Sequence, residues 1–239
     1  MKAIICAAGQ GKRLRPLTDD RPKPLIKVGE KTILEYMLDN ISECGIKEAV
    51  LILGYESQKV IEKIGAEHNG CRIKYYTNPE YSTTDNMFSL WQARKDIDQG
   101  IIFFNADIIF HKGILETLVD SSFLNAVAVD DRIALIDDSM KVSVVYGKIT
   151  AISKKLKNAN GWAVGIYKFS PEGAKQYYEE VRKLVESGAS DASFVKPVEL
   201  VSQYSPVYSV STNGLPWFEI DDFNDLETAR RDIPKIFEK

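Results

Sequence analysis

The sequence predicts an α/β fold: a doubly wound, mostly parallel mixed sheet with helices on both faces. Three observations predict it. Short apolar runs suited to buried strands alternate with helical patterns from residue 2 to residue 129. A glycine-containing stretch directly follows the first of these runs, as in folds where a strand turns into a ligand-binding loop. The chain has 239 residues, 44% of them apolar, which is enough for a substantial core.

The first half of the chain reads as repeated strand-and-helix units. Lys2–Cys6 is a short apolar run that predicts a buried strand. Thr32 and Glu35 have the spacing of a capping box, so a helix is expected to begin there and to end at Gly45. The other expected strands are 49–53, 72–76, 101–104 and 126–129, and the expected helices between them begin near Ser57, at Asp85 and near Ile114.

The second half changes character. Lys141–Tyr146 and Lys148–Ser153 alternate on either side of Gly147, which predicts an antiparallel hairpin, interpreted as a small flap. Ser170 followed by Pro171 is a strong helix start. The remaining expected elements are strands at 161–169, 207–210 and 217–220 and a C-terminal helix that Asp222 caps and that contains Leu226, Ala229, Ile233 and Phe237.

Composition excludes several classes of protein. Lys and Arg number 31 against 34 Asp and Glu, a net charge of −3, so the chain lacks the basic field expected of a nucleic-acid binder. No apolar stretch approaches a membrane span, so no membrane insertion is expected. Cys6, Cys44 and Cys71 have neither disulfide-framework nor zinc-ligand spacing, and a reducing cytoplasmic location fits best.

A possible phosphate-binding loop follows the first strand. The run from Ala7 to Thr18 reads AAGQGKRLRPLT, and PKPL follows at 22–25. Glycines after a strand allow backbone N–H groups to reach a phosphate chain, and nearby basic residues supply countercharge. The run matches neither familiar fingerprint, because Leu14 replaces the third glycine of GxGxxG and Cys6 replaces the first glycine of Walker A. Taken alone, it fits a tight turn with solvated basic residues equally well.

The longer string AAGQGKRLRPLTDDRPKPL resembles the signature loop of the sugar-phosphate and alcohol-phosphate nucleotidyltransferases. The resemblance implies a Rossmann-like, GT-A-like fold whose loop wraps a nucleoside triphosphate. By position, Arg13 would face the outer phosphates and Lys23 the reacting α-phosphate, as the catalytic pair. The other nucleotide-binding residues implied are Ala8, Gly9, Gly11, Lys12, Asn86 and Asp107.

The resemblance covers essentially the whole chain, and no composition break marks a second domain. We therefore expect a single nucleotidyltransferase domain over 1–239. Residues 1–130 would form the nucleotide-binding part. Residues 131–239, with the hairpin and the C-terminal helix, would form the acceptor-binding part.

Two aspartates are candidate ligands for Mg²⁺. Asp107 ends an aromatic strand and should project at the ligand-binding edge of the sheet, where a carboxylate holds a metal or caps a loop. The string GLPWFEIDDFNDL resembles the family's C-terminal W-x-E-I-D motif, which implies that Asp221 is the second ligand. The spacing of Asp222 to Asp225 instead predicts a helix N-cap.

The expected reaction needs charge neutralisation rather than a general base. A phosphomonoester is already ionised near neutral pH, and nothing arranges His68 or His111 as a base. Within the family, the loop, the segment Asn86–Leu90, the hairpin and the C-terminal string most resemble bacterial phosphocholine cytidylyltransferases. That resemblance implies transfer of CMP from CTP to a small phosphorylated amino alcohol or phosphonate with release of pyrophosphate.

An amino-alcohol acceptor needs aromatic faces and a carboxylate, because an ammonium group gains from cation–π and charge contacts. Tyr81, Trp162 and Trp217 are the candidate aromatic residues, and both tryptophans fit a core position equally well. Asp130 or Asp131 is the candidate acid, and Glu219 faces either solvent or the acceptor.

Three alternatives stay open. The acceptor could be a sugar 1-phosphate or inositol 1-phosphate, with CTP, UTP or dTTP as the donor. A glycosyltransferase usually carries D-x-D at the strand end, whereas Asn105–Ile109 has only one aspartate. A nucleotide sensor would not need Lys23, Asp107 and Asp221 together.

The hairpin and the 171–187 helix fit a homodimer and monomeric packing equally well.

Overall fold

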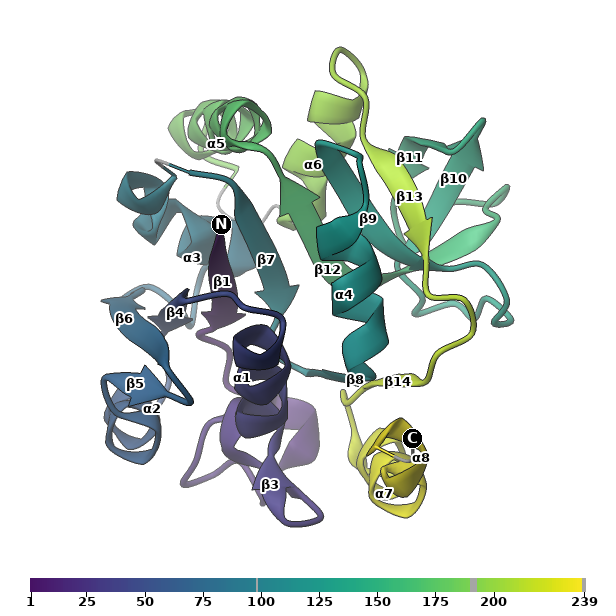
Figure 1. Ribbon diagram of the computed structural model, residues 1–239. Helices are drawn as coiled ribbons and strands as arrows, with labels where there is room; N and C mark the ends of the chain where they lie inside the picture. The colour runs from purple at the N-terminus through teal and green to yellow at the C-terminus, as the bar shows by residue number, and fades with distance from the viewer. Residues whose placement is uncertain (98, 190–192, 238–239) are drawn as a thin grey trace.

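The computed structural model describes residues 1–97, 99–189 and 193–237, and a ten-stranded sheet forms its centre (Figure 1). From one end of the sheet to the other, the strands are β10 (Lys141–Val145), β11 (Lys148–Ile152), β13 (Tyr208–Ser211), β9 (Asn125–Asp130), β12 (Gly161–Phe169), β7 (Ile101–Asn105), β1 (Lys2–Ala7), β4 (Glu48–Leu53), β6 (Cys71–Thr77) and β5 (Glu67–His68).

The sheet is mixed, with most of its strands running in one direction. Strands β7, β1, β4 and β6 are parallel neighbours, and so are β9 and β13. Strand β12 lies antiparallel between β7 and β9, so these two groups point the same way. The predicted fold class is confirmed, and the carboxyl ends of the parallel strands, where ligands bind in such folds, gather at one edge.

Helices cover both faces of the sheet (Figure 1). The first face carries α1 (Ile33–Glu43), α2 (Ser57–Ile64) and α4 (Lys112–Asp120). The second carries α3 (Asn86–Gln92), α5 (Pro171–Glu186) and α6 (Val195–Ser202). Within β1, Ala3 and Ile5 pack into the first core and Ile4 packs into the second, as the two-residue period of a strand requires.

Several local predictions are confirmed. Thr32 and Glu35 form the capping box of α1. Ser170 caps α5 by accepting a hydrogen bond from the Gly173 N–H. Helix α6 was not predicted. The minor elements are the strands β2 (Lys27–Val28) and β3 (Lys31–Thr32) and the 3₁₀ helices η1 (Lys12–Leu14), η2 (Lys23–Leu25) and η3 (Arg94–Asp96).

The predicted hairpin is present as β10 and β11, and it is joined to the sheet rather than standing apart as a separate flap. Tyr146 and Gly147 make the turn with φ values of 50° and 75°. Strand β11 pairs with β13, and β10 pairs with both β11 and β12. The pairings β10–β11–β13–β9–β12–β10 therefore close into a ring at this end of the sheet.

The C-terminal segment departs from the predicted arrangement. The strand β14 (Trp217–Glu219) pairs with β8 (Ile108–Phe110) in a separate two-stranded sheet instead of joining the large one. The predicted terminal helix is divided into α7 (Phe223–Asp232) and α8 (Pro234–Phe237), because a proline inside a helix removes a backbone donor and clashes with the preceding turn.

A third apolar cluster connects the two ends of the chain. It joins the N-terminal loop through Leu14, β8 through Ile109, and the C-terminal segment through Ile220 and Leu226. All four side chains are fully buried. Burial of this much apolar surface fixes the loop after β1 against the segment after β14, which brings their polar residues together.

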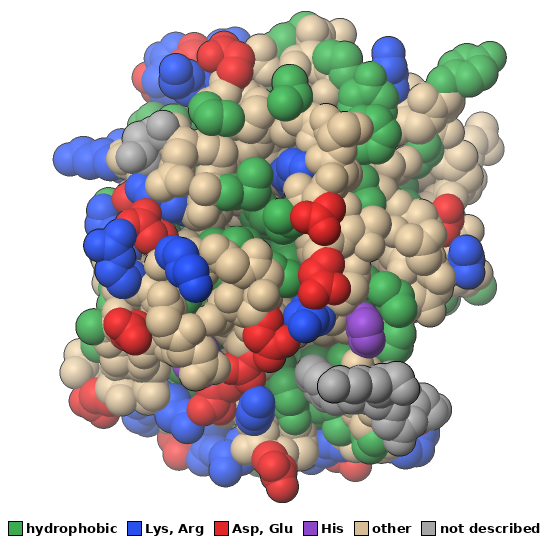
Figure 2. All heavy atoms as spheres, viewed as in Figure 1, with side chains coloured by type: hydrophobic (Ala, Val, Ile, Leu, Met, Phe, Trp, Pro, Cys, Tyr) green, Lys and Arg blue, Asp and Glu red, His purple; other side chains and the backbone are tan. Residues whose placement is uncertain are grey.

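The surface agrees with the balanced composition. Figure 2 shows Lys and Arg side chains interspersed with Asp and Glu on the face it displays, without a continuous basic surface there. Within residues 1–97, 99–189 and 193–237, no helix combines the length and apolar character that crossing a membrane requires.

Candidate active site

A cleft of about 400 Å³ opens where the loop after β1 meets the ends of β7 and β14. The predicted phosphate-binding residues line it together. The lining residues include Cys6, Gly9, Gln10, Gly11, Lys12, Arg13, Lys23, Tyr81, Ser82, Asp107 and Asp221. Residues from positions 6 to 221 thus converge on one opening, as expected at the carboxyl edge of such a sheet.

Gly11 permits the close packing of the loop. Its φ of 62° lies in the left-handed region that favours glycine. A Cβ at this position would lie only 2.9 Å from the Cβ of Lys23 and 3.2 Å from Cγ2 of Thr18. Thr18 Oγ1 also donates a 2.8 Å hydrogen bond to the Gly11 carbonyl. The glycine therefore brings the loop backbone directly against Lys23.

Lys23 lies between two carboxylates. Its Nζ donates to Asp107 Oδ2 at 2.9 Å and to Asp221 Oδ1 at 2.7 Å. All three side chains are mostly buried, with 13%, 25% and 18% exposed. Burial alone would lower the pKa of Lys23, but the two carboxylates outweigh it and raise that pKa above its usual value. The ammonium group is therefore held charged at a fixed place.

The pairing of β8 with β14 brings the two aspartates together. Asp107 lies between β7 and β8, and the Ile220 N–H donates to the Asp107 carbonyl at 2.9 Å. Burial would raise the pKa of Asp221, but Lys23 and Arg13 outweigh it and lower that pKa. Asp107 Oδ1 is buried and has no hydrogen-bond partner. The pair thus presents one unused carboxylate oxygen beside a cation.

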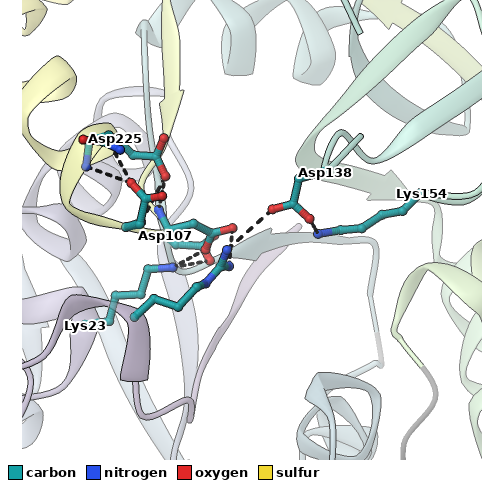
Figure 3. A network of polar contacts seen from close by, with 9 residues as sticks. Lys23, Asp107, Asp138, Lys154 and Asp225 are labelled. Carbon is teal, nitrogen blue, oxygen red and sulfur yellow. Dashed lines mark hydrogen bonds and ion pairs between the residues drawn. The ribbon is translucent and has the colours of Figure 1, made fainter. Parts of the chain in front are cut away.

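Arg13 connects Asp221 to Asp138. Figure 3 shows Lys23 and Asp107 at one end of this network of polar contacts and Lys154 at the other. The Arg13 guanidinium lies 2.7 Å from Asp221 Oδ2 and 3.6 Å from Asp138 Oδ2. Asp138 Oδ1 in turn lies 2.5 Å from Lys154 Nζ. Acidic and basic side chains therefore alternate from Asp107 to Lys154.

A second cleft, of about 340 Å³, adjoins the first and shares Arg13 and Asp221 with it. Its walls combine apolar and acidic side chains. Trp162 and Trp217 meet edge to face with ring centroids 5.2 Å apart. The other lining residues are Ile133, Ile136, Asp138, Phe218, Glu219, Asp222, Asp225 and Thr228.

Glu219 lines the second cleft and is partly buried. Burial, with further contributions from the negative charges of Asp107 and Asp221, raises its pKa to about 8. Asp222, its near neighbour, is the N-cap of α7 and accepts from the N–H groups of Asn224 and Asp225, as predicted. The three acidic residues 219, 221 and 222 therefore have three different environments.

Tyr81 lies apart from the two tryptophans. This tyrosine was predicted beside the acceptor, with the two tryptophans, but it lines the first cleft instead. A Cβ on Gly54 would lie 2.5 Å from its Cβ, and its ring centroid lies 6.3 Å from that of Tyr55. Tyr81 packs closely over the strand end because Gly54 leaves room for it.

Asp130 and Asn86, also predicted site residues, are not among the residues that line the two clefts. The Asp130 carboxylate is buried and accepts from Trp217 Nε1 at 2.9 Å and from the N–H groups of Arg132 and Ile133. It therefore holds a wall of the second cleft and does not line it. Asn86 begins α3, and its Oδ1 accepts from the Phe194 N–H at 3.1 Å.

Two more predicted residues, Asp131 and Ala8, form hydrogen bonds with other parts of the chain. The alternative acid, Asp131, accepts a hydrogen bond from Ser211 Oγ at 2.8 Å. Ala8 is buried, and its carbonyl accepts from the Tyr55 N–H at 3.1 Å. Neither residue is among those that line the two clefts.

Sequence reasoning missed Asp138 and Lys154. Both lie in loops beside the hairpin, which have no periodic pattern, and each has an acidic or basic neighbour of the same type. The only available signal was their closeness to the predicted hairpin. Their role in the site becomes visible only when the fold brings them to Arg13.

Several proteins are similar to this chain in sequence. The chain is 37% identical over 128 residues to the CMP-5'-(3-aminopropyl)phosphonate synthase of Streptomyces rubellomurinus, covering 54% of this chain and 20% of that protein. It is 28% identical over 262 residues to the CTP:phosphoglutamine cytidylyltransferase of Campylobacter jejuni, covering 95% and 98%. The chain spans only 52% and 54% of the length of two other relatives, both bifunctional proteins.

Solved structures share the fold over nearly the whole chain. The inositol-1-phosphate CTP transferase from T. maritima has a TM-score of 0.82 at 22% identity, covering 99% of this chain and 96% of that one. The CTP:phosphocholine cytidylyltransferase from Streptococcus pneumoniae has a TM-score of 0.76 at 23% identity, covering 97% and 98%.

Nearly the whole sequence matches one protein family. Residues 2–235 match the family described as nucleotidyl transferase, a span that includes the glycine loop, both aspartates of the first cleft and the walls of the second. The resemblance expected from the N-terminal loop is thus confirmed: this chain belongs to the nucleotidyl transferase family.

Proposed function

We propose that this protein is a magnesium-dependent cytidylyltransferase that transfers CMP from CTP to a small phosphorylated amino alcohol or aminoalkyl phosphonate and releases pyrophosphate. The observation that carries the proposal is the pair of adjoining clefts that share Arg13 and Asp221. One cleft suits a triphosphate and the other suits a small cationic headgroup. The shared residues lie where the two substrates would meet.

The first cleft has the features of a triphosphate site. Loop backbone between Gly9 and Lys12 lines it, and Lys23 and Arg13 supply two positive charges. Oriented N–H groups and fixed cations stabilise developing negative charge without reorganisation during the reaction. Lys23 would neutralise the α-phosphate and Arg13 the departing pyrophosphate.

The second cleft favours an acceptor that carries an amine. Two indoles and Phe218 provide aromatic surface, and Asp225 provides a carboxylate. The raised pKa of Glu219, about 8, leaves that side chain largely uncharged at neutral pH, so it offers a polar carboxyl group rather than a charge. Such a combination attracts an ammonium group through its positive charge. The names of the Streptomyces and Campylobacter relatives, which refer to an aminopropyl phosphonate and to phosphoglutamine, agree with an acceptor of this class.

The carboxylates of the first cleft fit a magnesium ion. Asp107 and Asp221 already converge on one cation, Lys23, and Asp107 Oδ1 has no hydrogen-bond partner. Among the described residues, no group of three or more His, Cys, Asp or Glu side chains is arranged to hold a metal. Two carboxylates leave room for the phosphate oxygens and waters that Mg²⁺ prefers. When bound there, Mg²⁺ neutralises phosphate charge and aligns the reacting groups.

The chemical step needs no base from the protein. A phosphate or phosphonate oxygen of the acceptor attacks the α-phosphorus of CTP, and the bond from that phosphorus to the β-phosphate oxygen breaks as pyrophosphate leaves. Both histidines lie outside the two clefts: His68 pairs with Asp39, and His111 caps α4. The protein therefore contributes alignment and charge.

Pyrophosphate release tests the proposal directly. The protein would be incubated with Mg²⁺, each of five nucleoside triphosphates (CTP, UTP, dTTP, ATP and GTP) and a panel of acceptors. The panel would contain phosphocholine, phosphoethanolamine, 3-aminopropylphosphonate, phosphoglutamine, inositol 1-phosphate and glucose 1-phosphate. The expected result is turnover with CTP and an amine-containing acceptor. Turnover only with inositol 1-phosphate or a sugar 1-phosphate would reject the acceptor class, and a preference for UTP or dTTP would reject the donor.

A further inference from the structure

The carboxylate of Asp138 lies between two cations from different parts of the site. Its Oδ2 lies 3.6 Å from the Arg13 guanidinium, and its Oδ1 lies 2.5 Å from Lys154 Nζ. Figure 3 shows Asp138 facing Lys154 on one side, with Lys23 and Asp107 on the other side of the network. Arg13 lines both clefts, whereas Lys154 follows the hairpin strand β11. A single carboxylate thus neutralises a cation of the first cleft and one beside the second.

The contacts of Asp138 are exposed and easily exchanged. The side chains of Asp138 and Arg13 are 54% and 58% exposed, and that of Lys154 is 46% exposed. Ion pairs this exposed are weak, because water and salt screen them. Arg13 is held more closely by Asp221, at 2.7 Å, than by Asp138. The contact between Asp138 and Arg13 is therefore the weakest point of the network.

Phosphate groups compete strongly for such cations. A phosphate carries more negative charge than a carboxylate and offers a guanidinium several oxygen acceptors. We propose that Asp138 is an internal competitor, an anion that occupies Arg13 and Lys154 in the free protein and that phosphate groups of the substrates displace. This proposal rests on the proposed function, because it assumes that phosphates bind at Arg13.

Displacement of Asp138 would also reach the wall of the second cleft. Asp138 belongs to a segment that includes Ile133 and Ile136, which line that cleft and are 46% and 57% exposed. The segment is also held by the Asp130 carboxylate, by Ser139 Oγ, which accepts from the Ile136 N–H, and by Lys141 Nζ, which donates to the Asp137 carbonyl. Release of the carboxylate from Arg13 thus removes a contact between this wall and the nucleotide loop.

Titration calorimetry with inorganic pyrophosphate at fixed Mg²⁺ tests the proposal. Asp138→Asn removes the competing charge, so we expect pyrophosphate to bind about three- to tenfold more tightly than to the natural protein. Asp138→Ser should give the same gain, and Asp138→Glu, which keeps the charge, should not. Asp137→Asn is the matched control: the neighbouring residue contacts Lys141 through its backbone carbonyl, so pyrophosphate affinity should stay within about twofold.

Ionic strength separates competition from a structural effect. The gain from Asp138→Asn should shrink at about 0.5 M salt, because screening weakens the interaction that the substitution removes. Thermal unfolding of each variant checks that the fold is retained. Equal or weaker pyrophosphate binding by Asp138→Asn and Asp138→Ser, with the natural protein binding normally, would overturn the competitor role and leave the proposed function standing. A natural protein that binds no pyrophosphate would overturn both.

Discussion

Lys23 Nζ and Asp221 Oδ1 lie 2.7 Å apart although 198 residues separate them in the sequence. Two elements make this contact possible. The pairing of β8 with β14 carries Asp221 to the end of β7, and the positive φ of Gly11 lets the N-terminal loop pack against Lys23. Both residues line the first cleft, so the contact joins distant parts of the chain there.

Replacement of Lys23 should separate catalysis from folding. We expect Lys23→Ala to lower turnover about a hundredfold or more, because it removes a fixed positive charge beside the reacting phosphate. It should also cost up to about 3 kcal/mol of unfolding free energy, because two mostly buried carboxylates lose their shared partner. Pyrophosphate release and chemical denaturation measure the two effects.

The control for this substitution is Lys27→Ala, which removes an exposed lysine four residues away. It should leave turnover and stability nearly unchanged, since exposed charges contribute little. Near-normal turnover in a folded Lys23→Ala protein would contradict the role given to Lys23.

The adjacent residues Asp221 and Asp222 should respond differently to substitution. Asp221→Asn should abolish most turnover and raise the Mg²⁺ concentration needed for half-maximal activity, because one of two expected ligands loses its charge. Asp222→Ala should instead cost about 1 kcal/mol of stability, because it removes the N-cap of α7. A magnesium titration of activity and a denaturation curve for each variant would show the contrast. If Asp222→Ala shifts the magnesium requirement and Asp221→Asn does not, Asp221 is not the metal ligand.

Gly11 and Gly9 provide a second contrast. Gly11→Ala forces a side chain into the left-handed region and places its Cβ 2.9 Å from the Cβ of Lys23, so we expect a loss of about 1 to 3 kcal/mol. Gly9→Ala meets no heavy atom within 4 Å and should leave stability almost unchanged. Thermal unfolding of both variants decides the matter, and equal melting temperatures would argue against a packing role for Gly11.

The parts of the site that sequence predicts best are those that lie in linear motifs. Arg13, Lys23, Asp107 and Asp221 each stand at a strand end or in a motif, and all four line the first cleft. Strand ends of a parallel sheet meet at one edge, so local patterns are enough to bring such residues together. Asp138 has no local pattern, and only the closure of β10 with β12 carries its loop to Arg13.

Side-chain partners are harder to predict than positions. Asp130 and Trp217 were both expected near the acceptor, and the sequence offered no reason to pair them. Their 2.9 Å hydrogen bond depends on the pairing of β14 with β8, which brings Trp217 to the carboxylate at the end of β9. A buried carboxylate needs hydrogen-bond donors. The donors to Asp130 are the Trp217 indole and two backbone N–H groups, so Asp130 holds in place a side chain that lines the second cleft.

Glu35 should give stability a measurable dependence on pH. Burial would raise its pKa, but Lys63 and the N–H and hydroxyl of Thr32 lower it to about 2, from an ordinary value of 4.5. A carboxylate whose pKa is lowered on folding stabilises the protein fully above its unfolded pKa. That contribution is therefore present above about pH 4.5 and is lost as the pH falls toward about 2.

Comparison with Glu35→Gln isolates this contribution. At pH 7 we expect the natural protein to be more stable than the variant by about 1 to 3 kcal/mol, and the difference should decline between pH 4.5 and pH 2. Urea denaturation at a series of pH values measures it. A difference that is independent of pH would show that the carboxylate charge is not what stabilises the start of α1.

Asp130 should act on the acceptor without touching it. Asp130→Ala leaves Trp217 Nε1 and two backbone N–H groups without their acceptor, so the indole loses the contact that fixes its orientation. We expect the KM for the acceptor to rise about tenfold, as for a loss of about 1.4 kcal/mol, while the KM for CTP and the pyrophosphate affinity stay close to normal. Asp131→Ala is the matched control, because the adjacent carboxylate binds Ser211 Oγ at the surface. A parallel rise in both KM values would mean that Asp130 supports the whole fold and not this wall. A rise confined to the KM for the acceptor substrate, and smaller in Asp130→Asn than in Asp130→Ala, would show that a hydrogen-bonding oxygen at this position orients Trp217.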